Sequence, residues 1–78
     1  MKFSDYLSAF ERMNTLILRR ATGSPAEFAA KMDFSEARLY RYLGEMKSLF
    51  KAPIVYNKSR KTYEYSEKFS LKEKKLWH

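Results

Sequence analysis

The spacing of apolar residues predicts helices in the first two thirds of the chain and short strands after them. In the first segment, apolar residues recur three and four positions apart, as on one side of a helix, at Phe3, Tyr6, Leu7, Phe10, Met13, Leu16 and Ile17. Ser4 can cap this helix, which we expect to end near Ala21 or Thr22, with Gly23 as the stop. In a domain this small, so long a stripe should face the core rather than a partner.

A second helix is predicted over residues 25–32, and three signals mark its start. Ser24 is a favourable N-cap, Pro25 suits the first helical position, and Glu27 can complete a capping box. The inner face of this helix should be formed by Phe28, Ala29 and Met32.

A third helix should follow a tight turn at Asp33-Phe34, with Ser35 as its cap. Asp33 is compatible with the left-handed backbone that such a turn requires. The residues expected to face inward are Leu39, Tyr42, Leu43, Met46, Leu49 and Phe50. At about 100° per residue, the residues pointing away from that stripe are Ala37, Arg41, Gly44 and Ser48, with Arg38 and Tyr40 beside them. The outward face therefore combines arginine with small side chains.

A β-hairpin is predicted after Ala52-Pro53, because proline restricts the residue before it and ends the helix. Its strands should span residues 54–56 and 62–65, and a polar turn joins them over residues 57–61. The linker between the first two helices, residues 20–23, leaves room for only a rudimentary additional strand.

The residues after the hairpin form a tail whose structure the pattern leaves open. Phe69 and Leu71 alternate with polar residues, which allows a third strand, whereas Ser70 with Glu73 can cap a short helix. Phe69 and Trp77 should pack rather than stay exposed. We expect one mainly α domain of the α+β class over residues 1–66 and a basic tail over residues 67–78.

The formal net charge is +7, and the excess lies toward the C-terminal part of the chain. Residues 1–50 contain eight Lys and Arg against six Asp and Glu, whereas residues 51–78 contain eight against three. A basic surface of this kind favours a polyanionic partner, although small proteins also carry such charge for solubility.

Composition excludes most catalytic chemistry. The chain has no cysteine, so disulfides, thiol chemistry and cysteine-ligated zinc are ruled out, and its one histidine is His78. No P-loop or metal-ligand cluster is present. We expect no enzymatic activity, no cofactor and no small-molecule ligand. No apolar run approaches the roughly 20 residues of a membrane span, and charged residues interrupt the N-terminus too early for a signal peptide, so we expect a cytoplasmic, nucleoid-associated protein.

One stretch carries a more specific pattern than helix spacing alone. Its marks are Phe28-Ala29, Met32, Phe34-Ser35, Leu39-Tyr40-Arg41-Tyr42-Leu43, Ala52-Pro53-Ile54, Tyr56 and Tyr63. With these marks, residues 15–65 resemble the winged helix-turn-helix of DeoR-type and WYL-type bacterial transcription regulators. Asp33 departs from the glycine usual in that turn. The ligand-sensing domain of those regulators is not present in this sequence, so sensing of a small molecule is not carried over.

The resemblance implies a protein that binds double-stranded DNA. In that family the third helix lies in the major groove, which here would be helix 35–50, while the hairpin turn 57–61 meets the backbone. Arg38 and Arg41 would contact base edges, because a guanidinium group matches guanine with two hydrogen bonds. The other implied contact residues are Ser24 and Ser35 at helix N-termini, Ala37 as a point of close approach, Tyr40, Lys58, Arg60 and Lys61.

Each of these residues also has a plainer role, and the function has alternatives. Arg38, Arg41 and the turn cations can be ordinary solvated residues, Ser24 and Ser35 cap their helices in any case, and Tyr40 can pack on the second helix. We expect a sequence-specific regulator that acts as a homodimer, because one such unit has a small footprint on DNA. The alternatives are a protein–protein interaction module and an excisionase-like accessory factor of a mobile element.

Overall fold

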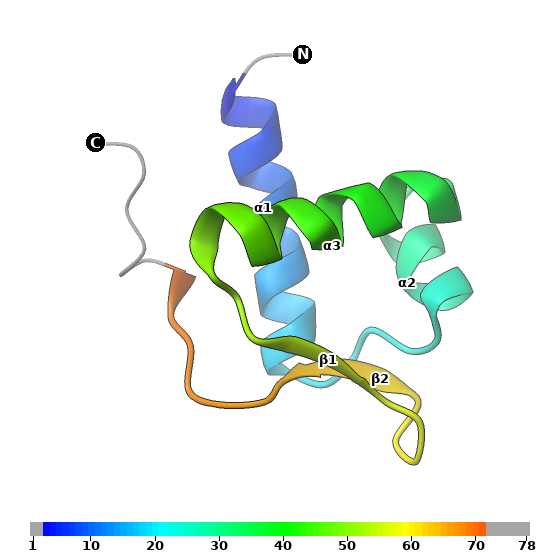
Figure 1. Ribbon diagram of the computed structural model, residues 1–78. Helices are drawn as coiled ribbons and strands as arrows, with labels where there is room; N and C mark the ends of the chain where they lie inside the picture. Colours follow the sequence, from blue (N-terminus) through cyan, green and yellow to red (C-terminus); the bar gives the residue numbers. More distant parts are fainter. Residues whose placement is uncertain (1–2, 72–78) are drawn as a thin grey trace.

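Three helices precede one β-hairpin in the computed structural model, which describes residues 3–71 (Figure 1). The helices are α1 (Phe3–Leu18), α2 (Pro25–Met32) and α3 (Glu36–Phe50). The strands β1 (Ile54–Asn57) and β2 (Thr62–Tyr65) pair antiparallel, with Ile54 opposite Tyr65 and Asn57 opposite Thr62. The expected α+β order of helices and hairpin is confirmed. α1 is helical from Phe3, so Ser4 lies inside the helix and is not its cap as predicted, a two-residue difference of the size that helix-end definitions produce.

α1 ends earlier than the apolar pattern predicted. Arg20 adopts a left-handed backbone (φ 52°), its N–H donates to the Ile17 carbonyl at 3.0 Å, and the Ala21 N–H donates to the Leu16 carbonyl at 3.0 Å. These two bonds close the helix in a Schellman motif. The prediction that the helix continues to Ala21 or Thr22 is therefore wrong, because Thr22 leaves the helix to reach β2.

Thr22 and Thr62 join the α1–α2 linker to the hairpin. Both side chains are buried, with exposed fractions of 0% and 2%, and their hydroxyl oxygens lie 3.0 Å apart. The Tyr63 N–H donates to the Thr22 hydroxyl at 2.8 Å, and the Thr22 N–H donates to the Thr62 hydroxyl at 3.3 Å. Linker residues 20–23 form no strand, so these hydroxyl contacts take the place of the rudimentary strand that the sequence suggested.

The predicted capping box at the start of α2 is confirmed. The Glu27 N–H donates to the Ser24 hydroxyl at 3.2 Å, and the Ser24 N–H donates to the Glu27 carboxylate at 3.1 Å. Gly23 precedes the box with a left-handed backbone (φ 73°), and a Cβ atom there would lie 2.9 Å from the Glu27 side chain. Glycine at this position therefore leaves room for the box, rather than ending α1.

A three-residue turn sets α2 against α3. Asp33 has the left-handed backbone expected of it (φ 60°, ψ 40°), and the Phe34 N–H donates to the Ala29 carbonyl at 2.8 Å. The Ser35 hydroxyl then caps α3 by accepting from the Arg38 N–H at 3.1 Å. The turn and cap predicted from the sequence are both confirmed.

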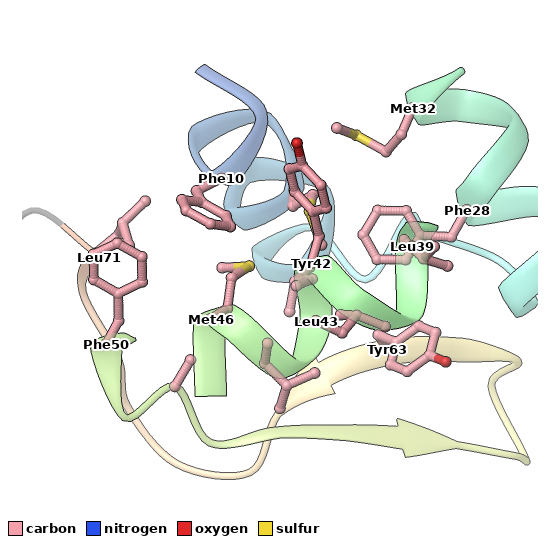
Figure 2. Close-up of a cluster of buried hydrophobic side chains, with 14 of the residues drawn as sticks. Phe10, Phe28, Met32, Leu39, Tyr42, Leu43, Met46, Phe50, Tyr63 and Leu71 are labelled. Carbon is pink, nitrogen blue, oxygen red and sulfur yellow. The ribbon is translucent and has the colours of Figure 1, made fainter. Parts of the chain in front are cut away.

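The core lies between α1, α2, α3 and the hairpin (Figure 2). Tyr42 occupies its centre, with 1% of the residue exposed, and confirms the prediction that it packs inside. Its ring centroid lies 4.7 Å from that of Phe34, 5.5 Å from that of Tyr6 and 5.6 Å from that of Phe10. α3 supplies the largest group of core residues, which are Leu39, Tyr42, Leu43, Met46 and Phe50.

Leu49 was predicted to face inward from α3, and this prediction is wrong. It is 47% exposed. The core at this end of the helix is already filled by Met46 and by Phe50, whose ring centroid lies 5.4 Å from that of Phe10. Leu49 lies at the side of that stripe and lines a shallow groove instead.

The chain after β2 packs back on the helices. The Tyr65 hydroxyl donates to the Asn14 side chain at 2.7 Å, and both Phe69 and Leu71 are buried in the core, as predicted for Phe69. The core thus continues past residue 66, where the domain was expected to end. Between β2 and residue 71 the chain forms no third strand. The predicted cap partner Glu73 and the predicted packing residue Trp77 lie outside the described residues.

Candidate nucleic-acid interface

α3 crosses the body of the molecule with one face uncovered (Figure 1). The four positions predicted to point outward are all exposed, namely Ala37, Arg41, Gly44 and Ser48. Tyr40 is 52% exposed beside them. Apart from Arg41, the middle of the face carries only small side chains, and the hairpin lies below α3 in Figure 1.

Gly44 lies near the middle of this face. A Cβ atom built there would meet nothing within 4 Å, so no neighbour in the described part of the chain requires glycine. Glycine inside a helix destabilises it by about 0.5–1 kcal/mol relative to alanine. The residue therefore lowers the surface of α3 at a cost in stability, which suits close approach by another molecule.

The two arginines of α3 are held differently. Arg41 is exposed, and its guanidinium carbon lies 5.6 Å from the centroid of the Tyr42 ring. Arg38 is half-buried, with its guanidinium carbon 5.1 Å above the Phe34 ring and 5.8 Å from that of Tyr42. Its Nε is buried and has no hydrogen-bond partner within residues 3–71. The structure thus lays Arg38 against aromatic rings instead of projecting it beside Arg41.

The hairpin tip presents three exposed cations, Lys58, Arg60 and Lys61. The Asn57 side chain accepts from the Arg60 N–H at 3.1 Å, and Lys61 has a left-handed backbone (φ 53°), so the turn is closed by local contacts. Within residues 3–71, none of the three cations forms an ion pair. The tip therefore concentrates three positive charges that form no ion pair with the described residues.

Ser24 and Ser35 are confirmed as helix caps, but the end of α2 is poorly suited to a phosphate. The N–H groups of Ser24 and Glu27 already bond to each other's side chains, and Pro25 has no N–H to offer. The Ser24 N–H, and then its hydroxyl, lower the pKa of the Glu27 carboxyl, which is therefore charged at neutral pH and repels an anion. Of the two caps, only Ser35 has no carboxylate bonded across it.

Three tyrosines line the approach from α3 to the hairpin. The Tyr56 and Tyr63 rings pack edge to face with centroids 5.0 Å apart. Burial raises the pKa of the Tyr63 hydroxyl, and Tyr40, Tyr56 and Glu36 lie close enough to raise it further. The Tyr40 hydroxyl therefore stands next to the hairpin, so the structure brings Ala37, Tyr40 and Arg41 together and places the hairpin tip beyond them.

The sequence analysis missed Phe34 as a neighbour of Arg38 and Tyr6 as a neighbour of Tyr42. Phe34 precedes the cap Ser35, and an apolar residue at that place commonly packs against the first turns of its helix, which is a signal that could have found it. Tyr6 lies on α1, 36 positions before Tyr42, and no local pattern indicates that their rings stack.

A shallow groove between α1 and α3 adjoins the exposed face. Its volume is about 340 Å³, and it is lined by Tyr6, Phe10, Glu45, Ser48 and Leu49. It holds a single carboxylate, and no cluster of three metal-ligating side chains occurs in the described residues. The groove is thus a nonpolar surface without grouped catalytic side chains.

Comparison of the chain with protein-family models, with curated proteins and with solved structures gave no match. Over residues 3–71, no helix has both the length and the apolar content that crossing a bilayer requires.

Proposed function

We propose that this chain is a winged helix-turn-helix protein that binds double-stranded DNA, with α3 in the major groove and the hairpin tip on the backbone. The observation that carries the proposal is the uncovered face of α3, which bears Arg41 among small side chains next to a basic hairpin. An α-helix with its side chains measures about 10–12 Å across, which matches the roughly 12 Å width of the major groove.

The low ridge of α3 supports the groove contact. Ala37, Gly44 and Ser48 keep the helix surface close to its backbone, so the helix can approach the edges of base pairs. Arg41 extends from the same face and can bond two acceptors of a guanine. Tyr40 is exposed and can donate its hydroxyl to a phosphate.

The unpaired cations of the hairpin support the backbone contact. Lys58, Arg60 and Lys61 carry three positive charges at a point that projects from the helices (Figure 1). Their binding to phosphates would release counterions, which makes affinity fall steeply with salt. We leave Ser24 out of the proposed interface because the Glu27 carboxylate covers its helix end.

This binding mode also leads us to propose a cellular role. A sequence-specific DNA-binding protein of this size fits a bacterial transcription regulator of the cytoplasm. A single α3 contacts few base pairs, so we propose a homodimer on DNA or a partner protein beside it.

A protein–protein interaction module is the second candidate, and one observation favours it. Leu49 is 47% exposed at the rim of the nonpolar groove between α1 and α3, and a protein partner can cover such a surface. Absence of salt-sensitive DNA binding at low ionic strength would favour this function over the first.

The decisive experiment is selection of bound duplexes from a random DNA pool, followed by fluorescence anisotropy on the enriched sequence. We expect enrichment of a common site and a Kd that rises with salt. Arg41→Ala should weaken binding to that site by about 1–3 kcal/mol and relax the preference at one position. Failure to enrich any sequence, together with no binding to bulk duplex at low salt, would reject the proposed function.

A further inference from the structure

Two guanidinium groups share one aromatic surface beside α3. This aromatic shelf consists of Phe34, Tyr42 and Tyr6, with centroids 4.7 Å apart for the first pair and 5.5 Å for the stacked second pair. Arg38 lies over Phe34 and Tyr42, and Arg41 lies over Tyr42. Two positive groups are therefore held within reach of the same ring.

Neither charge is neutralised by an ion pair within residues 3–71. Among the described residues, no carboxylate forms an ion pair with Arg38 or Arg41. Arg38 is the stronger case, because its Nε is buried without any hydrogen-bond partner. Buried donors are normally bonded, so Arg38 keeps donor capacity that residues 3–71 do not satisfy.

The shelf also fixes how Arg38 can be used. Contact with the faces of Phe34 and Tyr42 restrains the guanidinium group of Arg38 and leaves its outer N–H groups to form bonds. A planar group of this kind matches two oxygens of a phosphate. Because the geometry is already set in the free protein, little side-chain freedom is lost when an anion binds.

The position of Arg38 on α3 selects the backbone rather than the bases. The centre of the exposed face is formed by Ala37, Arg41 and Ser48, whereas Arg38 lies at the edge, where it is half-buried. When a helix lies in the major groove, its outward face meets the bases and its edges meet the phosphates that line the groove. An arginine held at the edge therefore reaches a phosphate first.

We propose that Arg38 and the aromatic shelf form a phosphate-binding site for the DNA backbone, so that Arg38 contacts a phosphodiester and Arg41 alone contacts a base. This inference rests on the proposed DNA-binding function and divides the roles within it. α3 is then flanked by two phosphate contacts, the shelf on the edge toward α1 and the hairpin tip on the other.

The test compares Arg38→Ala with Arg41→Ala on two duplexes, the enriched site and a scrambled duplex of the same composition, over a series of salt concentrations. Arg38→Ala should lower affinity for both duplexes by a common factor, about tenfold. The slope of log K against log salt should become shallower by about 0.9, the value for one lost phosphate contact. Arg41→Ala should instead reduce the ratio between the two duplexes.

Two further variants separate charge from geometry. Arg38→Lys keeps the charge but not the planar fork, so it should keep the salt slope and lose part of the affinity. Phe34→Leu removes the ring under Arg38 and keeps an apolar side chain, and it should act in the same way. Circular dichroism and thermal melting of each variant show whether it is folded before its binding is measured.

The outcomes distinguish this inference from the proposed function. If Arg38→Ala changes the ratio between the duplexes as Arg41→Ala does, Arg38 contacts a base and the inference is wrong while DNA binding stands. If Arg38→Ala leaves affinity and slope unchanged, Arg38 has a structural role only, and the inference is again overturned. If the unmodified protein binds neither duplex, the inference and the proposed function fail together.

Discussion

Two basic regions flank α3, namely Arg38 on its edge toward α1 and the tip of the hairpin. Both are positively charged, but their side chains are held in different ways. On the edge toward α1, Arg38 is half-buried and its guanidinium group lies over two rings, so the side chain is restrained before anything binds. At the hairpin tip, Lys58, Arg60 and Lys61 extend into solvent from a four-residue loop. Long exposed side chains lose more freedom on binding than one already stacked.

This difference predicts that the hairpin tip and Arg38 have different roles in DNA binding. The flexible cations of the tip can follow phosphates of any sequence, and they supply charge without a defined geometry. The stacked Arg38 contributes fewer charges but a fixed direction, which sets where α3 lies relative to the strand. Four sets of substitutions test this difference between Arg38 and the hairpin tip.

Removal of the tip charges should have the largest effect. Lys58→Ala combined with Lys61→Ala should weaken binding to all duplexes by about 2–3 kcal/mol and lower the salt slope by about 0.9 per lost phosphate contact. The matched control is Arg19→Ala with Lys68→Ala, which removes two exposed cations elsewhere on the molecule. Equal losses in the two double variants, measured by anisotropy, would mean that net charge and not the tip drives binding.

Thr22→Val should loosen the hairpin edge without touching the Arg38 edge. It replaces the hydroxyl that accepts from the Tyr63 N–H and contacts Thr62, and a buried N–H left unbonded costs about 1–3 kcal/mol. Urea denaturation should show this loss in the free energy of unfolding. An unchanged unfolding midpoint would show that the Thr22–Thr62 contact does not hold the hairpin.

The base of the hairpin should respond to alkaline pH. Burial raises the pKa of Tyr65, so the unfolded chain loses this proton near pH 10 while the folded protein keeps it. Stability from this group is therefore fully present below about pH 10 and falls as the pH rises further. Tyr65→Phe should remove that part of the alkaline decline, and at neutral pH should cost about 1 kcal/mol through the lost bond to Asn14.

Tyr63 can also contribute to a loss of stability at alkaline pH, because its pKa is raised too, mainly by burial. An alkaline decline of the same size in the unmodified protein and in Tyr65→Phe would assign the effect to other groups.

Gly44→Ala should have the smallest effect, and with opposite signs for stability and binding. Alanine meets no neighbour at this position, so it should stabilise the helix by about 0.5–1 kcal/mol while weakening DNA binding by raising the ridge of α3. Ser48→Ala, on the same face, serves as the control that adds no bulk. Higher stability with unchanged affinity would show that α3 does not approach its partner closely at Gly44.

Features that depend on neighbouring residues were predictable from the sequence. The capping box of Ser24 and Glu27, the Ser35 cap and the left-handed Asp33 each need only side chains within three positions. The outward positions of α3 followed from helical periodicity in the same way. These local signals were enough to establish the order of elements and the exposed face.

Features that depend on distant contacts were not predictable. The end of α1 is set by Thr22 reaching Thr62, 40 residues away. Arg38 looked like a neighbour of Arg41 on an exposed helix, and its stacking on Phe34 depends on how the turn folds back over α3. The prediction for Leu49 was wrong for a related reason. Met46 and Phe50 fill the core at this end of α3, so Leu49, at the side of the apolar stripe, stays exposed.

The Thr22–Thr62 contact has a consequence for how this chain can change in length. The contact joins the two ends of a segment that contains α2, α3, β1 and the hairpin loop. An inserted residue is therefore tolerated only where it does not move Thr22 or Thr62 out of contact. The loop at residues 58–61 meets that condition, since doubling a flexible loop costs only about 0.6 kcal/mol. Residues 20–23 do not, because one added residue there would carry the threonine hydroxyl away from the edge of β2. The hairpin loop can thus vary in length and change how far it extends toward a partner. The linker between α1 and α2 has to keep its length.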